Sequence, residues 1–378
     1  MMIKKIYMLL MFLLSRGLAV FSKRDKIVFL CSFGDNSVPV ANELIKRNPA
    51  TSIVFLYEQS AAKSLLNLDP RIAREKCEGI AMFSCISTLV SARKLVIDNY
   101  FAVLGALPKN DKSETIQVWH ANGAIKQFGY EDASNRARPL TDKKRFEKVY
   151  DFTDSYVVGS KQMQTIFEQS FEAKEKKFLP FGIARTDVFF DKKLMAQKRV
   201  EIRQQFEISE SKKVIVYAPT YRSGELSNEL QLDLELLRRD HSEDSVLLIK
   251  RHPRLNDTDL FLNDDFVKVI PNTTVLTDFY PAIDVLISDY SSIPFEISLL
   301  PTVKKMLFFC YDEKEYELQQ GLQQNWQTML PGPIVATSAS LSEELKSVPY
   351  KANYEGYNKT WNTYTTGNAV KQLADYLQ

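Results

Sequence analysis

The sequence predicts an α/β protein built from two domains, each with a doubly wound parallel sheet. Short apolar runs that are typical of buried strands alternate with helix-like segments, as they do in such sheets. The alternation starts after residue 26 and starts again near residue 214. In addition, 378 residues exceed the size at which a single hydrophobic core keeps growing.

Each domain is expected to hold strands that are rich in β-branched and aromatic residues. In the first domain these are Ile27–Cys31, Ile53–Tyr57, Lys94–Ile97, Ile116–Trp119 and Tyr156–Val158, with helices at Val38–Lys46, Lys143–Tyr150 and Met163–Glu168. In the second domain they are Val214–Ala218, Val246–Lys250, Val267–Ile270, Val285–Ile287 and Met306–Phe309. The polar helical stretch Lys192–Glu210 is expected to connect the two domains.

Charge and cysteine content narrow the class of protein. Lys and Arg number 49 and Asp and Glu number 47, which gives a formal charge of +2. This balance argues against a general nucleic-acid binder, so no nucleic acid is expected as a partner. The four cysteines form no CxxC pair, and we interpret them as reduced core residues of a cytoplasmic protein. They are Cys31, Cys77, Cys85 and Cys310.

Residues 1–25 combine an apolar run, Ile6–Leu14, with basic residues on both sides. This run is too short to span a bilayer. We expect an uncleaved helix at the membrane surface, with its basic residues near anionic lipid headgroups. A secretory signal peptide, which also has a basic start and a short apolar run, is one alternative. A structural helix packed on the domain is another.

The stretch Val285–Leu300 places polar residues between two apolar runs. A short strand is expected to end in a turn, and Pro294 then begins a helix with Glu296 in its first turn. Ser291 and Ser292 lie at the positive end of that helix, which suits a phosphate group. Ordinary N-capping by serine is the alternative.

His120 follows an expected strand in the segment WHANG. Open α/β sheets bind their ligands at the carboxyl ends of strands, and a histidine there can accept a proton near neutral pH. A hydrogen-bonded structural histidine is the alternative. Gly123 would let the backbone approach a ligand closely.

Two further segments combine a turn with a cation. In LPFGIARTD a strand is expected to end near Leu179, and Arg185 then points toward an anion or pairs with Asp187 or another acid. Thr186 or Asp187 is expected to cap the helix that follows. In YAPTYR, Pro219 fixes a turn that carries Thr220 and Arg222, which suits phosphate binding or a simple polar loop.

The segment KRHP ends a buried strand in three side chains that can be cationic. Such a cluster requires an anion or carboxylates nearby. Lys250 and His252 share one face of the strand, because side chains alternate. By contrast, His241 lies in a run of charged residues and is expected in a solvated loop.

These segments, taken in order with a later LPGP at Leu330–Pro333, resemble the CDP-glycerol glycerophosphotransferases of wall teichoic acid synthesis. The resemblance covers roughly residues 25–375. It implies a GT-B fold, in which two Rossmann-like domains face each other across a cleft and CDP-glycerol binds mainly to the second. The implied parts are a membrane-associating helix at 1–25, an acceptor domain at 26–205, a CDP-glycerol domain at 206–365 and a helix at 366–378 that crosses back to the first domain.

The resemblance also implies roles for individual residues. His120 is the expected general base for the acceptor hydroxyl, with His252 as the alternative base or as a partner of the donor pyrophosphate. Asp289 is expected to brace its turn, and cationic side chains and helix starts are expected to act without a metal or another cofactor. The expected donor-binding residues are Asn122, Gly123, Arg185, Pro219, Thr220, Arg222, Lys250, Ser291, Ser292 and Glu296.

One departure from the family pattern suggests a subclass. Polymerising members usually carry WHG and then a Thr-Pro pair, whereas this chain has His120-Ala121-Asn122-Gly123-Ala124. This variant resembles the TagB/TarB-type primases of Gram-positive bacteria, which implies a peripheral enzyme on the cytoplasmic face of the membrane. The implied partners are CDP-glycerol, the membrane surface, other teichoic acid enzymes and an undecaprenyl-diphosphate-linked N-acetylmannosaminyl-N-acetylglucosamine acceptor, with CMP released. The alternatives are a glycerol or ribitol phosphate polymerase, a capsule polyol-phosphate transferase, or a non-catalytic membrane scaffold.

Overall fold

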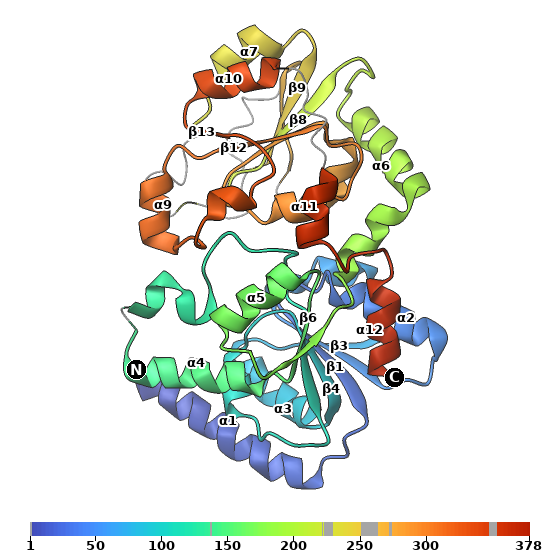
Figure 1. Cartoon of the computed structure of the whole chain (residues 1–378). Helices are drawn as coiled ribbons and strands as arrows, with labels where there is room; N and C mark the ends of the chain where they lie inside the picture. Colours follow the sequence, from blue (N-terminus) through green and yellow to red (C-terminus); the bar gives the residue numbers. More distant parts are fainter. Residues whose placement is uncertain are drawn as a thin grey trace. The chain divides into compact units, whose positions relative to one another are not determined.

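The computed structural model of the chain describes residues 2–136, 138–220, 222, 230–250, 264–271, 274–347 and 354–378. The chain forms two compact units, each built on its own sheet (Figure 1). The first unit consists of residues 1–122, 129–190 and 362–378. The second unit consists of residues 123–128 and 191–361.

The described residues of the first unit form a seven-stranded parallel sheet in the order β3-β2-β1-β4-β5-β6-β7. In this order Val28 of β1 lies beside Val54 on one side and Leu95 on the other. The order reverses between β1 and β4, and ligands bind at such a switch point. The strands are β1 Lys26–Cys31, β2 Ile53–Tyr57, β3 Ala73–Lys76, β4 Ala92–Ile97, β5 Glu114–Gln117, β6 Ser155–Val157 and β7 Lys177–Leu179.

Helices cover this sheet, and the last helix of the chain is one of them. Leu373 and Leu377 of that helix, α12, share a buried apolar cluster with Leu44 of α2 and Phe29 of β1. Burial of such side chains favours docking by about 1.5–3 kcal/mol each. The α-helices of this unit are α1 Met2–Phe21, α2 Ser37–Arg47, α3 Met82–Val90, α4 Leu140–Phe152, α5 Lys161–Ser170 and α12 Ala369–Leu377, and two 3₁₀ helices used below are η4 Ala102–Ala106 and η7 Ala184–Phe190.

The described residues of the second unit form a six-stranded parallel sheet in the order β10-β9-β8-β11-β12-β13. Counted from β8, this repeats the order of the first sheet, with the reversal between β8 and β11. The strands are β8 Lys213–Tyr217, β9 Ser245–Ile249, β10 Val267–Val269, β11 Val285–Ser288, β12 Lys305–Phe309 and β13 Ile334–Val335. The α-helices are α6 Lys192–Gln205, α7 Leu234–His241, α8 Ile293–Ile297, α9 Glu313–Gln320, α10 Ser338–Lys346 and α11 Tyr354–Trp361.

Every strand for which the sequence predicts both a first and a last residue is present in the structure. The predicted and observed ends of these strands differ by two residues or fewer. The end of β7 at Leu179 also agrees with the sequence. The strands β3 and β13 are not predicted. The side chains of β3, with the sequence AREK, are all exposed, and β13 has only two residues, so no apolar run marks either of them. A short edge strand owes its conformation to its neighbour more than to its own sequence.

The expected connector is an integral helix of the second unit. Arg199 of α6 donates to the carbonyls of Pro281 and Ala282 and forms an ion pair with Asp284 at 2.8 Å. The long segment of the second unit therefore begins at Asp191, whereas the sequence placed the domain boundary after residue 205.

His241 is buried, contrary to what the sequence predicted. Instead of lying in a solvated loop, it ends α7 with 6% of its surface exposed, and its Nε2 lies 3.0 Å from the hydroxyl of Ser342. Burial lowers the pKa of this imidazole, so the neutral form is favoured. All four cysteines are buried, and none of them forms a disulfide.

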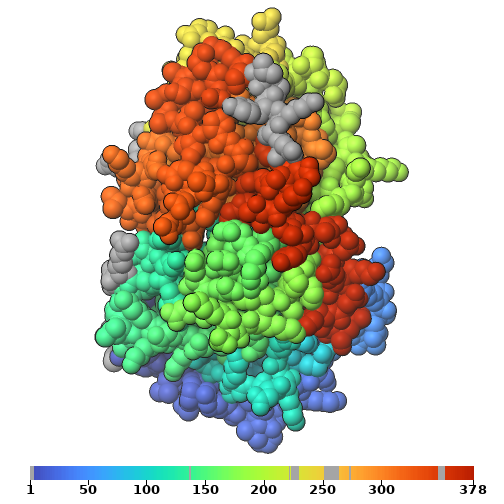
Figure 2. Space-filling view, in the orientation of Figure 1, coloured from blue at the N-terminus to red at the C-terminus, as the bar shows by residue number. Residues whose placement is uncertain are grey.

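Helix α1 packs on the first unit through one face and exposes apolar residues on another. On the packed face, Met11 and Ser15 are buried, and the hydroxyl of Ser15 donates to the carbonyl of Ala106 at 2.9 Å. The exposed apolar residues include Ile6, Leu9, Leu10 and Leu13. Figure 2 shows α1, in dark blue, at the surface of this unit. Among the described helices, none combines the length and hydrophobicity that a membrane span requires.

Candidate active site

At the switch point of the first sheet, the carboxylate of Asp98 holds the loop that follows β1. It accepts the backbone N–H groups of Ser32, Phe33 and Gly34 at 2.9, 2.9 and 2.7 Å. Burial raises the pKa of Asp98, and these three donors oppose that rise because they stabilise the charged form. Asp98 therefore joins the ends of β1 and β4, the two strands at which the order reverses.

His120 lies beside this loop, just beyond the end of β5. Its ring stacks on Phe33 and on Trp119, with centroids 4.1 and 4.2 Å away. Its Nδ1 lies 2.9 Å from the carbonyl oxygen of Asp98. A carbonyl can only accept, so Nδ1 carries the proton and the lone pair of the neutral ring is on Nε2. The structure thus favours the tautomer in which Nε2 is the basic nitrogen.

A strained backbone at Trp119 positions this histidine. Trp119 has φ of 56°, a left-handed conformation that is rare for a bulky residue and costs about 1–3 kcal/mol. Two hydrogen bonds hold it: its N–H donates to the side chain of Gln117, and its carbonyl accepts from the side chain of Asn36, both at 2.9 Å. Such strain is typical of functional sites.

Arg185, in η7 after β7, reaches the same edge of the first sheet. Its guanidinium pairs with Asp35 at 2.7 Å, and its backbone N–H donates to the side chain of Asn36 at 2.9 Å. The partner is thus Asp35 and not Asp187. Asp187 instead accepts the N–H groups at the start of α12, so it caps a helix far along the chain and not the one that follows it.

Three residues at this edge were missed by sequence reasoning. Asp98 anchors the first loop, and Asp35 and Asn36 hold Arg185. Each follows an expected strand within a few residues, in the segments Phe33–Asn36 and Asp98–Tyr100. A search for polar residues after every strand, and not only after those in recognisable motifs, would have found them.

Asn122 and Gly123 take part in packing. The side chain of Asn122 is fully buried and donates to the side chain of Asn362 at 2.9 Å, and its own oxygen meets no donor among the described residues. A Cβ at Gly123 would lie 2.7 Å from the ring of Phe295, closer than such atoms can approach. The close approach that Gly123 permits is therefore to an aromatic ring of its own unit.

In the second unit, Asp289 braces the turn as expected. Its buried carboxylate accepts the backbone N–H of Thr220 at 2.9 Å and the hydroxyl of Thr220 at 3.0 Å. It also pairs with Arg222 at 2.9 Å. Burial raises the pKa of Asp289, and Arg222 and Thr220 oppose that rise. These contacts join the loops after β8 and β11 at the second switch point.

Arg222 is enclosed by protein groups. Its Nε and Nη2 donate to the two oxygens of Asp312 at 2.6 and 3.0 Å, and the guanidinium lies 4.5 Å from the ring centre of Tyr316. Burial opposes its charge, but the bond to Asp312 and the charge of Asp289 raise its pKa above the ordinary value. Both residues that the sequence placed on this turn as phosphate ligands, Thr220 and Arg222, are engaged in the network around Asp289.

The serines lie at the start of the short helix α8. The hydroxyl of Ser291 accepts the N–H of Ile293 at 3.2 Å, whereas Ser292 occupies the capping position without a side-chain capping bond. Pro294 lies in the first turn of this helix, as expected. Glu296 is buried, and the hydroxyl of Tyr280 donates to it at 3.3 Å.

The remaining expected residues are Pro219, Lys250 and His252. Pro219 lies just beyond the end of β8 and is half-buried. Lys250 follows β9, and its ammonium donates to the carbonyls of Pro271 and Thr274 at 2.8 and 3.0 Å. His252 lies outside the described residues. Within the described parts of the chain, no group of three or more His, Cys, Asp or Glu side chains is placed to hold a metal ion.

Comparison with known families adds to this geometry. A family model described as CDP-Glycerol:Poly(glycerophosphate) glycerophosphotransferase matches residues 11–378. The chain belongs to this family. The membership makes it a glycerophosphotransferase of teichoic acid synthesis, the enzyme class that the motifs suggested.

Two curated relatives of this glycerophosphotransferase match along nearly their whole length. The teichoic acid glycerol-phosphate primase of Bacillus subtilis strain 168 is 34% identical over 94% of this chain and 92% of the relative. The teichoic acid glycerol-phosphate primase of Staphylococcus aureus strain NCTC 8325 is 30% identical over 100% of this chain and 98% of the relative.

Solved structures agree with the fold. The wall teichoic acid polymerase TagF, in a structure with CDPG, aligns with a TM-score of 0.75 at 22% identity. The alignment covers 94% of this chain and 89% of that chain. The two Rossmann-like units of the glycerophosphotransferase therefore give it the GT-B class of fold, as the sequence predicted.

Proposed function

We propose that this enzyme transfers the first glycerol phosphate from CDP-glycerol to an undecaprenyl-diphosphate-linked N-acetylmannosaminyl-N-acetylglucosamine, and that CMP is released. The observation that carries the proposal is the match to glycerol-phosphate primases over nearly the full length of both chains. The same observation favours a primase over a polymerase or a scaffold.

His120 is the proposed general base. The hydrogen bond from its Nδ1 to the carbonyl of Asp98 leaves the lone pair of the neutral ring on Nε2. In the proposed step, an acceptor hydroxyl attacks the phosphorus that carries glycerol, and Nε2 takes the hydroxyl proton. The bond from that phosphorus to the oxygen of CMP breaks, and CMP leaves with the electron pair.

On the donor side, Ser291 and Ser292 are the proposed partners of the pyrophosphate, and the family resemblance adds His252. The network of Asp289, Arg222 and Thr220 supports this proposal indirectly, since it holds the two loops at the switch point of the second sheet. Phosphoryl transfer depends mainly on positioning and on stabilisation of charge. Hydrogen bonds and an ion pair between the two loops support such positioning.

The proposed place of action is the cytoplasmic face of the membrane, where the lipid acceptor would be reached. Helix α1 supports this proposal, because Ile6, Leu9, Leu10 and Leu13 are exposed on its surface and Lys4 and Lys5 precede them in the same helix. Exposed apolar side chains next to cations are typical of helices that lie in the headgroup region of a bilayer.

The decisive assay offers the enzyme two lipid acceptors with CDP-glycerol. One is the disaccharide lipid without glycerol phosphate, and the other already carries one unit. A primase should release CMP and add a single unit with the first lipid only, as measured by mass spectrometry of the product. Long products, or reaction with the second lipid, would instead indicate a polymerase, and CDP-ribitol offered in parallel tests the donor.

Substitution His120→Asn tests the base. An asparagine side chain can still donate to the carbonyl of Asp98, but it cannot accept a proton at neutral pH. We expect the rate of CMP release to fall by about 10²–10⁴-fold, the usual contribution of general base catalysis. Thermal unfolding serves as the control for folding. An unchanged rate in a folded variant would contradict the assignment of His120.

A further inference from the structure

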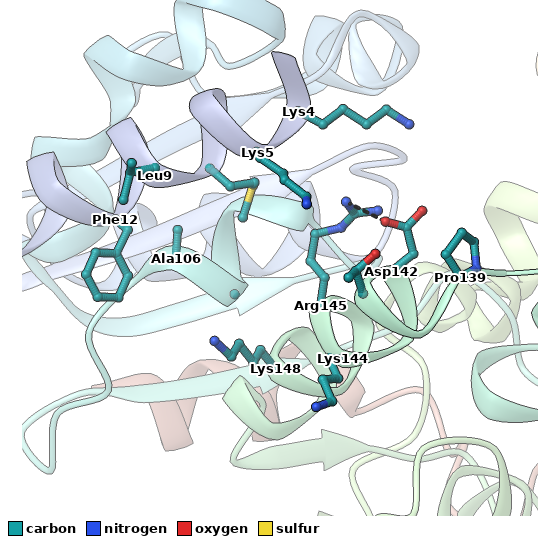
Figure 3. Close-up of a pocket in the computed structure, with 13 residues that line it drawn as sticks. Lys4, Lys5, Leu9, Phe12, Ala106, Pro139, Asp142, Lys144, Arg145 and Lys148 are labelled. Atoms are coloured by element: carbon teal, nitrogen blue, oxygen red, sulfur yellow. Dashed lines mark ion pairs between the residues drawn. The ribbon is translucent and has the colours of Figure 1, made fainter. Parts of the chain in front are cut away.

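A groove in the first unit lies between helices α1 and α4. It has a volume of about 590 Å³ (Figure 3). Its lining includes Gly105 and Ala106 of η4, and the small size of these residues leaves room between the two helices. Met8, Leu9 and Phe12 of α1 add apolar surface. None of these residues belongs to the site around His120.

The groove is lined by an excess of cations. Lys4 and Lys5 project from α1, and Lys144 and Lys148 project from α4 (Figure 3). Among the described residues, no carboxylate forms an ion pair with any of these four lysines. Arg145 also lines the groove, but Asp142 neutralises it at 3.1 Å. Four cations beside apolar surface suit an anion of more than one charge that is attached to a hydrocarbon chain.

A second cavity of about 370 Å³ adjoins the groove and shares Lys4, Met8 and Arg145 with it. Its lining also includes Tyr100. The ring of Tyr100 lies 6.4 Å from that of Trp119, which stacks on His120. The groove thus continues into a cavity that is lined by Tyr100. Tyr100 lies next to Trp119, the residue whose ring stacks on the proposed base, His120.

The outer rim of the groove is apolar. Leu9 is 56% exposed, and Leu140, which begins α4 beside the lining residue Pro139, is 75% exposed. Such side chains are suited to contact with lipid, while the lysines that line the groove would lie at the level of the phosphates.

We propose that the groove between α1 and α4 binds the diphosphate and the first isoprenyl units of a polyprenyl-diphosphate-linked acceptor. The inference rests on the proposed lipid acceptor and assigns a place to its anionic part. The four lysines exceed the single charge of an ordinary phospholipid phosphate. In addition, the adjoining cavity gives space beside Tyr100, whose ring lies near the Trp119 ring that stacks on His120.

The test is a calorimetric titration of the full chain with farnesyl diphosphate, a soluble molecule that joins a diphosphate to a short isoprenyl chain. Inorganic diphosphate, farnesol and phosphatidylglycerol vesicles are titrated in parallel. We expect farnesyl diphosphate to bind more tightly than the other three. Equal binding of inorganic diphosphate would indicate a plain anion site, equal binding of farnesol a plain apolar site, and a preference for vesicles a phospholipid site. Any of these results overturns the proposal.

Substitutions locate the binding. Lys144→Gln with Lys148→Gln should weaken farnesyl diphosphate binding by about 30-fold, because two of the four cations are lost. Lys143→Gln with Lys161→Gln is the matched control, since it removes the same charge and neither residue lines the groove. An unchanged affinity in the first variant, or an equal loss in the control, overturns the proposal.

Transfer activity separates this inference from the proposed function. In the lysine variant we expect the KM for the lipid acceptor to rise while the KM for CDP-glycerol stays unchanged. If the wild-type chain transfers nothing to the lipid acceptor, the proposed function fails, whereas the binding pattern above would still support the groove as a site for a diphosphate lipid.

Discussion

Arg222 lies among two carboxylates and three tyrosine rings. It pairs with Asp289 and Asp312, both of which are buried, and Tyr290, Tyr311 and Tyr316 surround its guanidinium. A charge without water needs partners of this kind, because desolvation is more costly than a single ion pair can offset. Arg222 thus helps to hold the loop after β8 against the residues that follow β11 and β12.

Arg222→Met should therefore lower the free energy of unfolding by about 3–5 kcal/mol, the usual effect of removing one member of a buried ion pair. Urea unfolding measures this change. Arg238→Met is the matched control, because Arg238 pairs with Asp264 at the surface of the same unit and should contribute at most about 1 kcal/mol. Equal losses in the two variants would contradict the structural importance of Arg222.

The stability of the same variant should depend more strongly on pH than that of wild type, through Asp289. Burial already raises the pKa of this carboxyl, and Arg222 opposes the rise, so removal of Arg222 should raise it further. A carboxyl with a raised pKa binds its proton more tightly in the folded chain than in the unfolded chain. The free energy of unfolding of Arg222→Met should thus fall, relative to wild type, as the pH rises above the raised pKa that Asp289 has in the wild-type chain. Parallel pH profiles for the two proteins would contradict this.

Helix α12 is held by a residue from another part of the chain. Asp187 accepts the N–H groups of Ala369 and Val370 at 3.1 and 2.8 Å, whereas Asn368 makes no side-chain capping bond. A carboxylate at a helix start also interacts favourably with the helix dipole. Helix α12 is in this way attached to η7, the 3₁₀ helix that also carries Arg185.

Asp187→Ala should loosen α12 at its first turn and lower the free energy of unfolding by about 0.5–2 kcal/mol, the usual effect of losing an N-cap. Hydrogen exchange of the amides of Ala369 and Val370 should accelerate, because they lose their acceptor. Asp191→Ala is the comparison, since Asp191 caps α6 and should affect that helix only. Unchanged exchange at the start of α12 would contradict the capping role.

The whole molecule is expected to bind membranes through α1. Leu10→Ser with Leu13→Ser removes two exposed apolar side chains, and we expect at least about a tenfold loss of binding to phosphatidylglycerol vesicles, measured by co-sedimentation. Leu66→Ser with Leu318→Ser is the control, because those leucines are even more exposed but lie outside α1. Equal binding by the two variants would contradict a membrane-facing role for α1.

Local sequence was sufficient to predict much of the fold. Buried strands such as β1 and β9 are continuous apolar runs, and a run of this kind can be recognised without knowledge of its neighbours. The ordered set of motifs was sufficient to predict the family, and WHANG, FGIARTD, YAPTYR and SDYSSIPFE each follow or end a strand. The edge strand β3 could not be found in this way, since none of its side chains is buried.

Folding decided which polar residues meet. Asp312 lies 90 positions from Arg222, and Asp187 lies 183 positions from Val370, so no local pattern connects them. The local sequence identified Arg222 and Thr220 as polar residues on a turn. In the folded chain both are bound to Asp289, and they hold the loops after β8 and β11 together. It was likewise tertiary packing that gave His120 its tautomer, because the carbonyl that sets it belongs to Asp98, which follows another strand.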